Sequence, residues 1–196
     1  MKLPKLFLLV LWLSLLMQVS LAEVNRFVSF VNNPTPAHYD AIVAELNVQT
    51  AEYKEWNGFQ RDYKEWVKFL RLIEAANTLA IDLAEKLAPK TDGANLEDLC
   101  RAVGMNVRSH PELVLQVLKK NRVSEYQLGC RLTMLPKSTI DKIDTMLVEL
   151  EARAAAISTV KNLELSDYKK MAMTILYDEI YSLRGARGDI PFQKRR

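Results

Sequence analysis

The spacing of apolar residues between positions 140 and 157 constrains the fold of this chain more than any other feature. Apolar side chains recur there every three or four residues, which places them on one face of an α-helix. A helix with one apolar face must bury it against other elements. Glycine is scarce, with six in 196 residues, and no long stretch alternates apolar and polar residues. The stripe consists of Ile140, Ile143, Leu147, Leu150, Ala154 and Ile157. An all-α fold is therefore expected.

Three long helical regions are predicted. The first spans Pro36–Leu87, where Asn57-Gly58 is either a weak point in one helix or the junction of two helices, because glycine destabilises a helix interior by about 1 kcal/mol. The second spans Ser138–Val160, with Ser138 and Asp141 as its cap. The third spans Asp167–Arg184, with Gly185 placed to end it. The run Phe27–Val31 before them resembles a strand, or an apolar segment that docks on helices.

Short helices with clear starting signals lie between the long ones. One is expected from Asn95 to about Gly104, and two more should open with the capping-box spacings Ser109/Glu112 and Ser124/Gln127. The predicted fold is an irregular antiparallel helical bundle, with three short disulfide-clipped helices between long helices.

The clip is a predicted disulfide between the chain's two cysteines, Cys100 and Cys130. One intramolecular bond is the simplest use of two cysteines in an oxidising compartment. Closing a loop of this length should stabilise the fold by about 3–4 kcal/mol.

The first 22 residues have the pattern of a secretory signal peptide. Lys2 and Lys5 precede the apolar run Leu6–Met17, and small residues precede a cut after Ala22. The run is shorter than the roughly 20 apolar residues of a membrane span. The predicted organisation is a signal peptide at 1–22, a single helical domain at 23–184 and a flexible basic tail at 185–196. The protein is expected to be secreted.

Charge and motifs exclude several classes of function. The formal charge is +3, and removing the two signal-peptide lysines leaves +1. The excess lies in the tail, which is too small a basic patch to indicate a nucleic-acid partner. The chain lacks a nucleophile elbow, a phosphate loop and a His-Glu-x-x-His motif. Two separated histidines, His38 and His110, do not form a zinc-ligand pattern. We therefore expect no enzymatic activity, no cofactor and no metal site.

The leading functional expectation is a helical binding protein that acts through contacts with an extracellular or cell-surface protein of unknown identity. The alternative is a carrier of a small hydrophobic ligand in a cavity between helices. Its candidate lining is the aromatic block Tyr53, Trp56, Phe59, Tyr63, Trp66 and Phe69.

The tripeptide Arg187-Gly188-Asp189 suggests a third role, adhesion to cells, because it resembles the recognition sequence of integrin ligands. That resemblance implies that the Asp189 carboxylate joins a receptor-bound divalent cation and that the Arg187 guanidinium meets an acidic group. The alternative is a solvated tail that follows the last helix.

Overall fold

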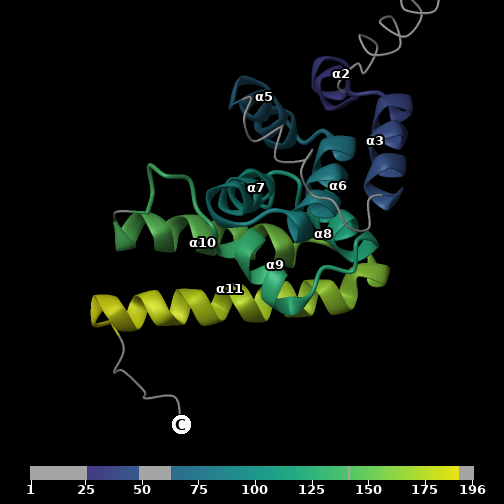
Figure 1. Ribbon diagram of the computed structural model, residues 1–196. Helices are drawn as coiled ribbons and strands as arrows, with labels where there is room; N and C mark the ends of the chain where they lie inside the picture. The colour runs from purple at the N-terminus through teal and green to yellow at the C-terminus, as the bar shows by residue number, and fades with distance from the viewer. Residues whose placement is uncertain (1–25, 49–62, 141, 190–196) are drawn as a thin grey trace, which may run out of the picture. The chain divides into compact units, whose positions relative to one another are not determined.

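A computed structural model describes residues 26–48, 63–140 and 142–189 (Figure 1). All regular secondary structure in the described residues is helical, with no strand. They belong to two compact units that divide after Tyr53. The predicted signal peptide, the Asn57-Gly58 junction and most of the basic tail lie outside the described residues.

The first unit is a pair of packed helices, α2 (Arg26–Asn32) and α3 (Pro36–Val48). The strand-like run is helical and forms α2, whose phenylalanines Phe27 and Phe30 are fully buried. Their spacing of three residues suits one face of a helix, which explains why this short apolar run does not adopt a strand.

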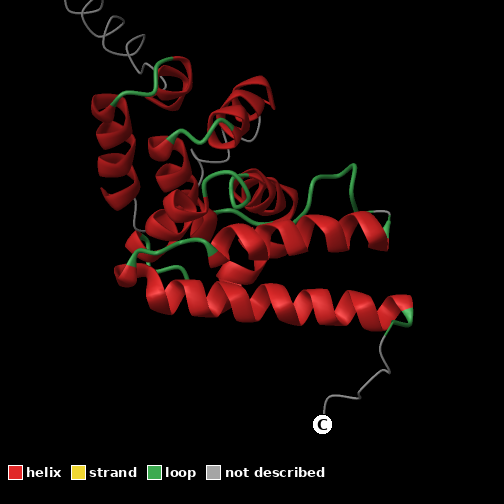
Figure 2. Ribbon diagram, turned by 180° about the vertical axis from the view of Figure 1, so that it is seen from behind, coloured by secondary structure: helices red, strands yellow, loops and turns green. Residues whose placement is uncertain are grey.

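The second unit contains the other helices. They are α5 (Tyr63–Glu74), α6 (Thr78–Leu87), η1 (Ala88–Lys90), α7 (Gly93–Met105), α8 (Pro111–Lys120), α9 (Glu125–Thr133), α10 (Ile143–Ser158), η2 (Leu163–Leu165) and α11 (Ser166–Arg187). In both ribbon views α10 and α11 lie side by side (Figures 1 and 2). Lys169 near the start of α11 binds carbonyls at the end of α10, and Arg187 at the other end binds Asp144, so the two helices are antiparallel. No helix in the described ranges has both the length and the apolar character that crossing a bilayer requires.

The long helical region predicted for Pro36–Leu87 is interrupted between α5 and α6, although the amino-acid composition there favours a continuous helix. Helix α5 ends at Glu74, and Ala76 has a φ of 58°. Asn77 then caps α6, since its side chain accepts a hydrogen bond from the Ala80 amide at 3.0 Å. Asn106, which is buried, donates to the Ile73 carbonyl at 2.7 Å near the end of α5. Alanine favours helices, so the turn depends on its own backbone bonds to Leu72 and Ile73, on the Asn77 cap and on this distant asparagine.

The prediction of three short disulfide-clipped helices is supported only in part: the predicted bond between the first and third of these helices is present, but it does not clip all three. A single disulfide, Cys100–Cys130, is present, and it joins α7 to α9 without holding α8. The expected contrast between long and short helices holds for α10 and α11, with 16 and 22 residues, but not for α5 and α6, whose 12 and 10 residues do not exceed the 13 of α7.

Predicted caps differ in outcome. Ser124 and Gln127 form a complete capping box at α9, as predicted. Helix α8 instead begins after His110, which makes no side-chain capping bond. Helix α10 begins at Ile143 rather than after Ser138, because residues 137–140 form turns. The spacing of polar residues correctly predicted that all three helices exist. It gave the correct capping residues only for α9.

Arg153 on α10 is a charged residue with no solvent exposure. Its Nη1 donates to the carbonyls of Leu132 and Met134 at 2.8 and 3.0 Å, at the end of α9. Its Nε donates to Glu149 at 3.0 Å. Burial lowers the pKa of Arg153, although Glu149 opposes that shift. A buried cation at a helix C-terminus satisfies carbonyls that have no partner within the helix and interacts well with the helix dipole.

Helices α7 and α9 approach each other closely at Gly104. A Cβ atom at Gly104 would lie 2.5 Å from the Arg131 carbonyl oxygen and 3.0 Å from Arg153 Nη1. We expect Gly104→Ala to lower the free energy of unfolding by about 1–3 kcal/mol, because the clash exceeds the gain in helix propensity. Denaturant unfolding measures this change.

Gly129→Ala is the matched control for that substitution. It also replaces a glycine inside a helix, but its Cβ would lie 4.0 Å from Ile175, at an ordinary contact distance. We expect it to be neutral or to stabilise the protein by about 0.5–1 kcal/mol. Equal effects of the two substitutions would contradict a specific close approach at Gly104.

Candidate functional site

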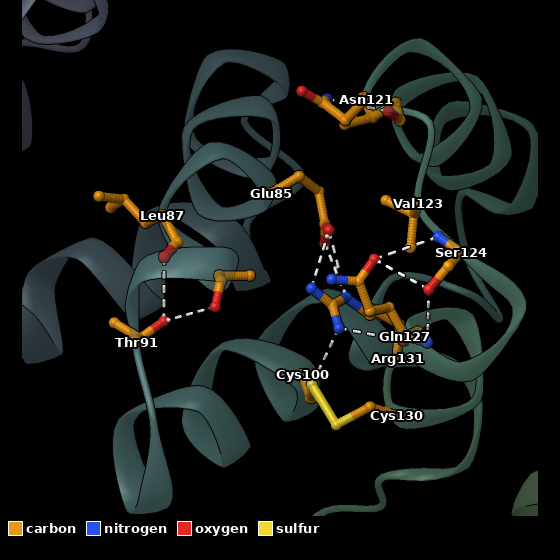
Figure 3. A network of polar contacts seen from close by, with 12 residues as sticks. Glu85, Leu87, Thr91, Cys100, Asn121, Val123, Ser124, Gln127, Cys130 and Arg131 are labelled. Carbon is orange, nitrogen blue, oxygen red and sulfur yellow. Dashed lines mark hydrogen bonds and ion pairs between the residues drawn. A yellow bond between two sulfur atoms is a disulfide. The ribbon is translucent and has the colours of Figure 1, made fainter. Parts of the chain in front are cut away.

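The strongest candidate site surrounds the first turns of α9, where a capped helix start lies beside a buried polar network (Figure 3). The Ser124 hydroxyl accepts from the Gln127 amide, while the Gln127 side chain accepts from the Ser124 amide at 3.1 Å. A capping box satisfies two backbone amides that a helix start otherwise leaves unpaired. The exposed side chains of this turn are therefore presented from a fixed backbone.

The segment before α9 is anchored to α6 by Asp82. This carboxylate is buried and accepts from Asn121 Nδ2 at 2.7 Å and from Lys120 Nζ at 3.1 Å. Lys86 Nζ donates to Asn121 Oδ1 at 3.3 Å. These bonds fix the end of α8 against α6, so the short connection to α9 starts from a defined position.

A buried ion pair between Glu85 and Arg131 lies at the centre of the network. The two side chains are 2% and 3% exposed. Arg131 Nε lies 3.1 and 3.2 Å from the two Glu85 oxygens, and Nη2 lies 3.0 Å from Oε2. Figure 3 shows the guanidinium and the carboxylate pointing toward each other between α6 and α9. Burial raises the pKa of Glu85, while the charge and hydrogen bonds of Arg131 act in the opposite direction.

The remaining donor of Arg131 connects the ion pair to the disulfide. Nη1 donates to the Gln127 carbonyl at 3.0 Å and lies 3.6 Å from Cys100 Sγ. The Cα atoms of Cys100 and Cys130 are 5.6 Å apart. The ion pair, the capping box and the disulfide thus form one connected group that joins α6, α7 and α9.

A hollow of about 870 Å³, partly open to solvent, lies over this group and is here called the α9 hollow. Tyr126 lies on it and is 92% exposed, although α9 itself is well anchored. The lining combines small or apolar groups with polar ones and consists of Ala88, Leu96, Ser124, Glu125, Tyr126, Gln127, Gly129, Cys130 and Arg131. This surface can accept an apolar group while offering hydrogen bonds around it.

Glu85 and Arg131 were not predicted as site residues. Each lies in a short run bounded by two buried leucines, Leu83 and Leu87 on α6 and Leu128 and Leu132 on α9. An acid in one such run and a base in the other is a signal for a buried pair, but the sequence does not show that the two runs face each other.

The predicted aromatic lining is divided among different environments. Tyr63 is 74% exposed, whereas Trp66 and Phe69 are buried with ring centroids 5.8 Å apart. Tyr53, Trp56 and Phe59 lie outside the described residues. A ligand cavity in this block stays a prediction, and the α9 hollow is lined by other residues.

The adhesion tripeptide forms the end of α11. The helix continues past Arg184 and through Gly185, which was predicted to stop it, and ends at Gly188 with a φ of 88°. The Gly188 amide donates to the Gly185 carbonyl at 3.1 Å and the Asp189 amide to the Arg184 carbonyl at 3.0 Å. These two bonds form a Schellman motif, in which glycine suits the left-handed position.

Both charged groups of the tripeptide have partners within the protein. Arg187 Nε donates to Asp189 at 2.7 Å, and Nη1 donates to Asp144 of α10 at 2.6 Å. These interactions raise the pKa of Arg187, and the bond from Arg187 lowers the pKa of Asp189. A receptor that binds the tripeptide as the integrin resemblance implies would have to displace both contacts. Adhesion remains a prediction, and the structure supplies a local folding role for the same three residues.

Among the described residues, no group of three or more histidines, cysteines and carboxylates is arranged to hold a metal ion. Comparisons with models of protein families, with curated proteins and with solved structures find no match to this chain. A functional hypothesis for this protein therefore depends on the chemistry of its own surface.

Proposed function

We propose that this protein is a secreted, non-enzymatic helical binding protein that contacts an extracellular or cell-surface protein through the α9 hollow. The observation that carries the proposal is the position of Tyr126, which is almost fully exposed on a helix turn fixed by a capping box. Tyrosine is enriched at protein interfaces, where it supplies a large contact area with little loss of conformational entropy.

The chemistry of the hollow favours an apolar side chain from a folded protein partner. The partly exposed Leu96 provides apolar contact area, and Ser124 and Gln127 provide polar groups. An apolar group in the hollow with Tyr126 beside it has the form of an interface hot spot, in which a packed centre is surrounded by polar contacts. The expected secretion and the Cys100–Cys130 disulfide both suit an extracellular partner.

Tyr126→Ala tests this proposal. With processed wild-type and variant protein as baits, partners would be captured from extracellular fluid and cell surfaces and quantified by mass spectrometry. We expect the variant to bind the wild-type partner about 30-fold more weakly, as for a hot-spot residue worth about 2 kcal/mol. Tyr177→Ala is the control, because Tyr177 is 57% exposed on α11 and does not line the hollow.

The two variants distinguish the outcomes. A loss restricted to Tyr126→Ala supports the α9 hollow as the contact surface, whereas equal retention or equal loss in both variants overturns it. Native mass spectrometry of secreted protein addresses the carrier alternative. A bound small molecule in that experiment would favour the carrier function over protein binding, and a mass equal to that of the protein alone would exclude it.

A further inference from the structure

The two cysteines of the disulfide differ in their exposure to solvent. Cys100 on α7 has no solvent exposure. Cys130 on α9 is partly exposed and lines the α9 hollow. A molecule entering from solvent through the hollow therefore reaches Cys130 and not Cys100. Access decides which sulfur of a disulfide a thiolate attacks.

The buried sulfur also has a cationic neighbour. Arg131 Nη1 lies 3.6 Å from Cys100 Sγ. Glu85 binds Nε and Nη2 of the same guanidinium, and the Gln127 carbonyl accepts from Nη1, so Nη1 is held in place beside Cys100 Sγ. A nearby guanidinium favours the thiolate form of a cysteine, and a more stable thiolate is a better leaving group.

We propose that Cys100–Cys130 is a thiol-exchange site with a fixed direction, in which a thiol such as glutathione or a protein cysteine attacks Cys130 through the α9 hollow.

The exchange has two steps. The thiol first loses its proton to solvent, and the thiolate lone pair forms a bond to Cys130 Sγ. The electrons of the Cys100–Cys130 bond leave with Cys100 Sγ, which becomes a thiolate beside Arg131. A second thiolate then attacks the external sulfur of the mixed disulfide and releases Cys130. Two external thiols are thereby oxidised to one disulfide, and the two protein thiolates take up two protons from solvent and become thiols. This proposal is independent of the proposed binding function.

The direction of exchange is tested on the oxidised, processed protein under native conditions. The protein would be incubated briefly with reduced glutathione, free thiols would be trapped with iodoacetamide, and the modified peptides would be mapped. We expect glutathione on Cys130 and the alkyl group on Cys100, in at least about tenfold excess over the reverse pattern. In denaturant the preference should disappear. Glutathione on Cys100 to an equal or greater extent, or no native adduct at all, would overturn the proposal.

A second variant tests the route through the hollow without changing the disulfide or Arg131. Leu96 lines the hollow, so Leu96→Trp should obstruct it and slow native exchange about tenfold. Leu163→Trp is the matched control, since Leu163 is strongly exposed on η2 and does not line the hollow. Circular dichroism would confirm that both variants remain folded. Equal exchange rates in the two folded variants would show that attack does not occur through the hollow.

Discussion

Arg131→Met should lower the free energy of unfolding by about 3–5 kcal/mol at neutral pH, because it leaves the Glu85 carboxylate buried without its cation. The two side chains are almost completely excluded from solvent, and Arg131 donates to both carboxylate oxygens. The substitution also removes the bond to the Gln127 carbonyl. Chemical denaturation monitored by circular dichroism measures the loss.

The effect of Arg131→Met should depend on pH. Burial already raises the pKa of Glu85 above its usual value of 4.5, and Arg131 opposes that rise. Without Arg131 the folded-state pKa should rise further. Between the unfolded and folded pKa values the folded protein binds more protons, so stability falls as pH rises. The difference between wild type and variant should therefore increase from acidic to neutral pH.

Two further variants show whether the loss of stability comes from the unpaired buried charge of Glu85 or from removing any arginine. Glu85→Leu combined with Arg131→Met should recover most of the lost stability, because replacing both members of a buried ion pair by apolar groups is often neutral or stabilising. Arg108→Met is the control. Arg108 lies 3.6 Å from Glu149 but is 64% exposed, and pairs in such positions contribute little. If Arg131→Met and Arg108→Met had equal effects, the buried pair would not have the role assigned to it.

Replacing both cysteines by alanine should lower the free energy of unfolding by about 3–4 kcal/mol. The Cys100–Cys130 bond spans a sequence separation of 30 residues, and without it the unfolded chain gains conformational freedom. The bond also holds α7 to α9 beneath the capping box. The expected result is a lower denaturant midpoint, measured against the oxidised wild type.

The reduced wild-type protein is the control for the cysteine replacement, because it lacks the covalent bond but keeps both sulfur atoms. We expect its stability to be close to that of the double-alanine variant, apart from the small packing contribution of the two thiols. A double-alanine variant as stable as the oxidised protein would contradict a stabilising role of the bond. A native mass equal to the reduced mass, without the loss of two hydrogens, would show that the bond does not form.

Local interactions explain what could be predicted. The capping box of α9 depends on Ser124 and Gln127, which are three residues apart, and the helical class depends on repeated spacings of three and four residues. The pairing of Cys100 with Cys130 could be predicted without the structure, because the chain has no other cysteine. Such features depend on residues that are close together in the sequence, or they have only one possible partner.

The end of α11 shows where local signals were insufficient. Gly185 and Gly188 are both suitable helix stops, and the sequence favoured the first. The helix uses Gly188, and the additional turn carries Arg187, which binds Asp144 on α10. The choice between two equivalent glycines therefore involves a helix that is distant in sequence.

By itself, the sequence determined the helical class, the disulfide and the first turn of α9. Tertiary structure alone decided that Arg153 is buried, that Gly104 must lack a side chain and that Glu85 meets Arg131. Glu85 and Arg131 are 46 residues apart, and burying either charge alone would be unfavourable. Their place in the core depends on α6 and α9 facing each other. That arrangement follows from the packing of the whole second unit, which no local sequence pattern encodes.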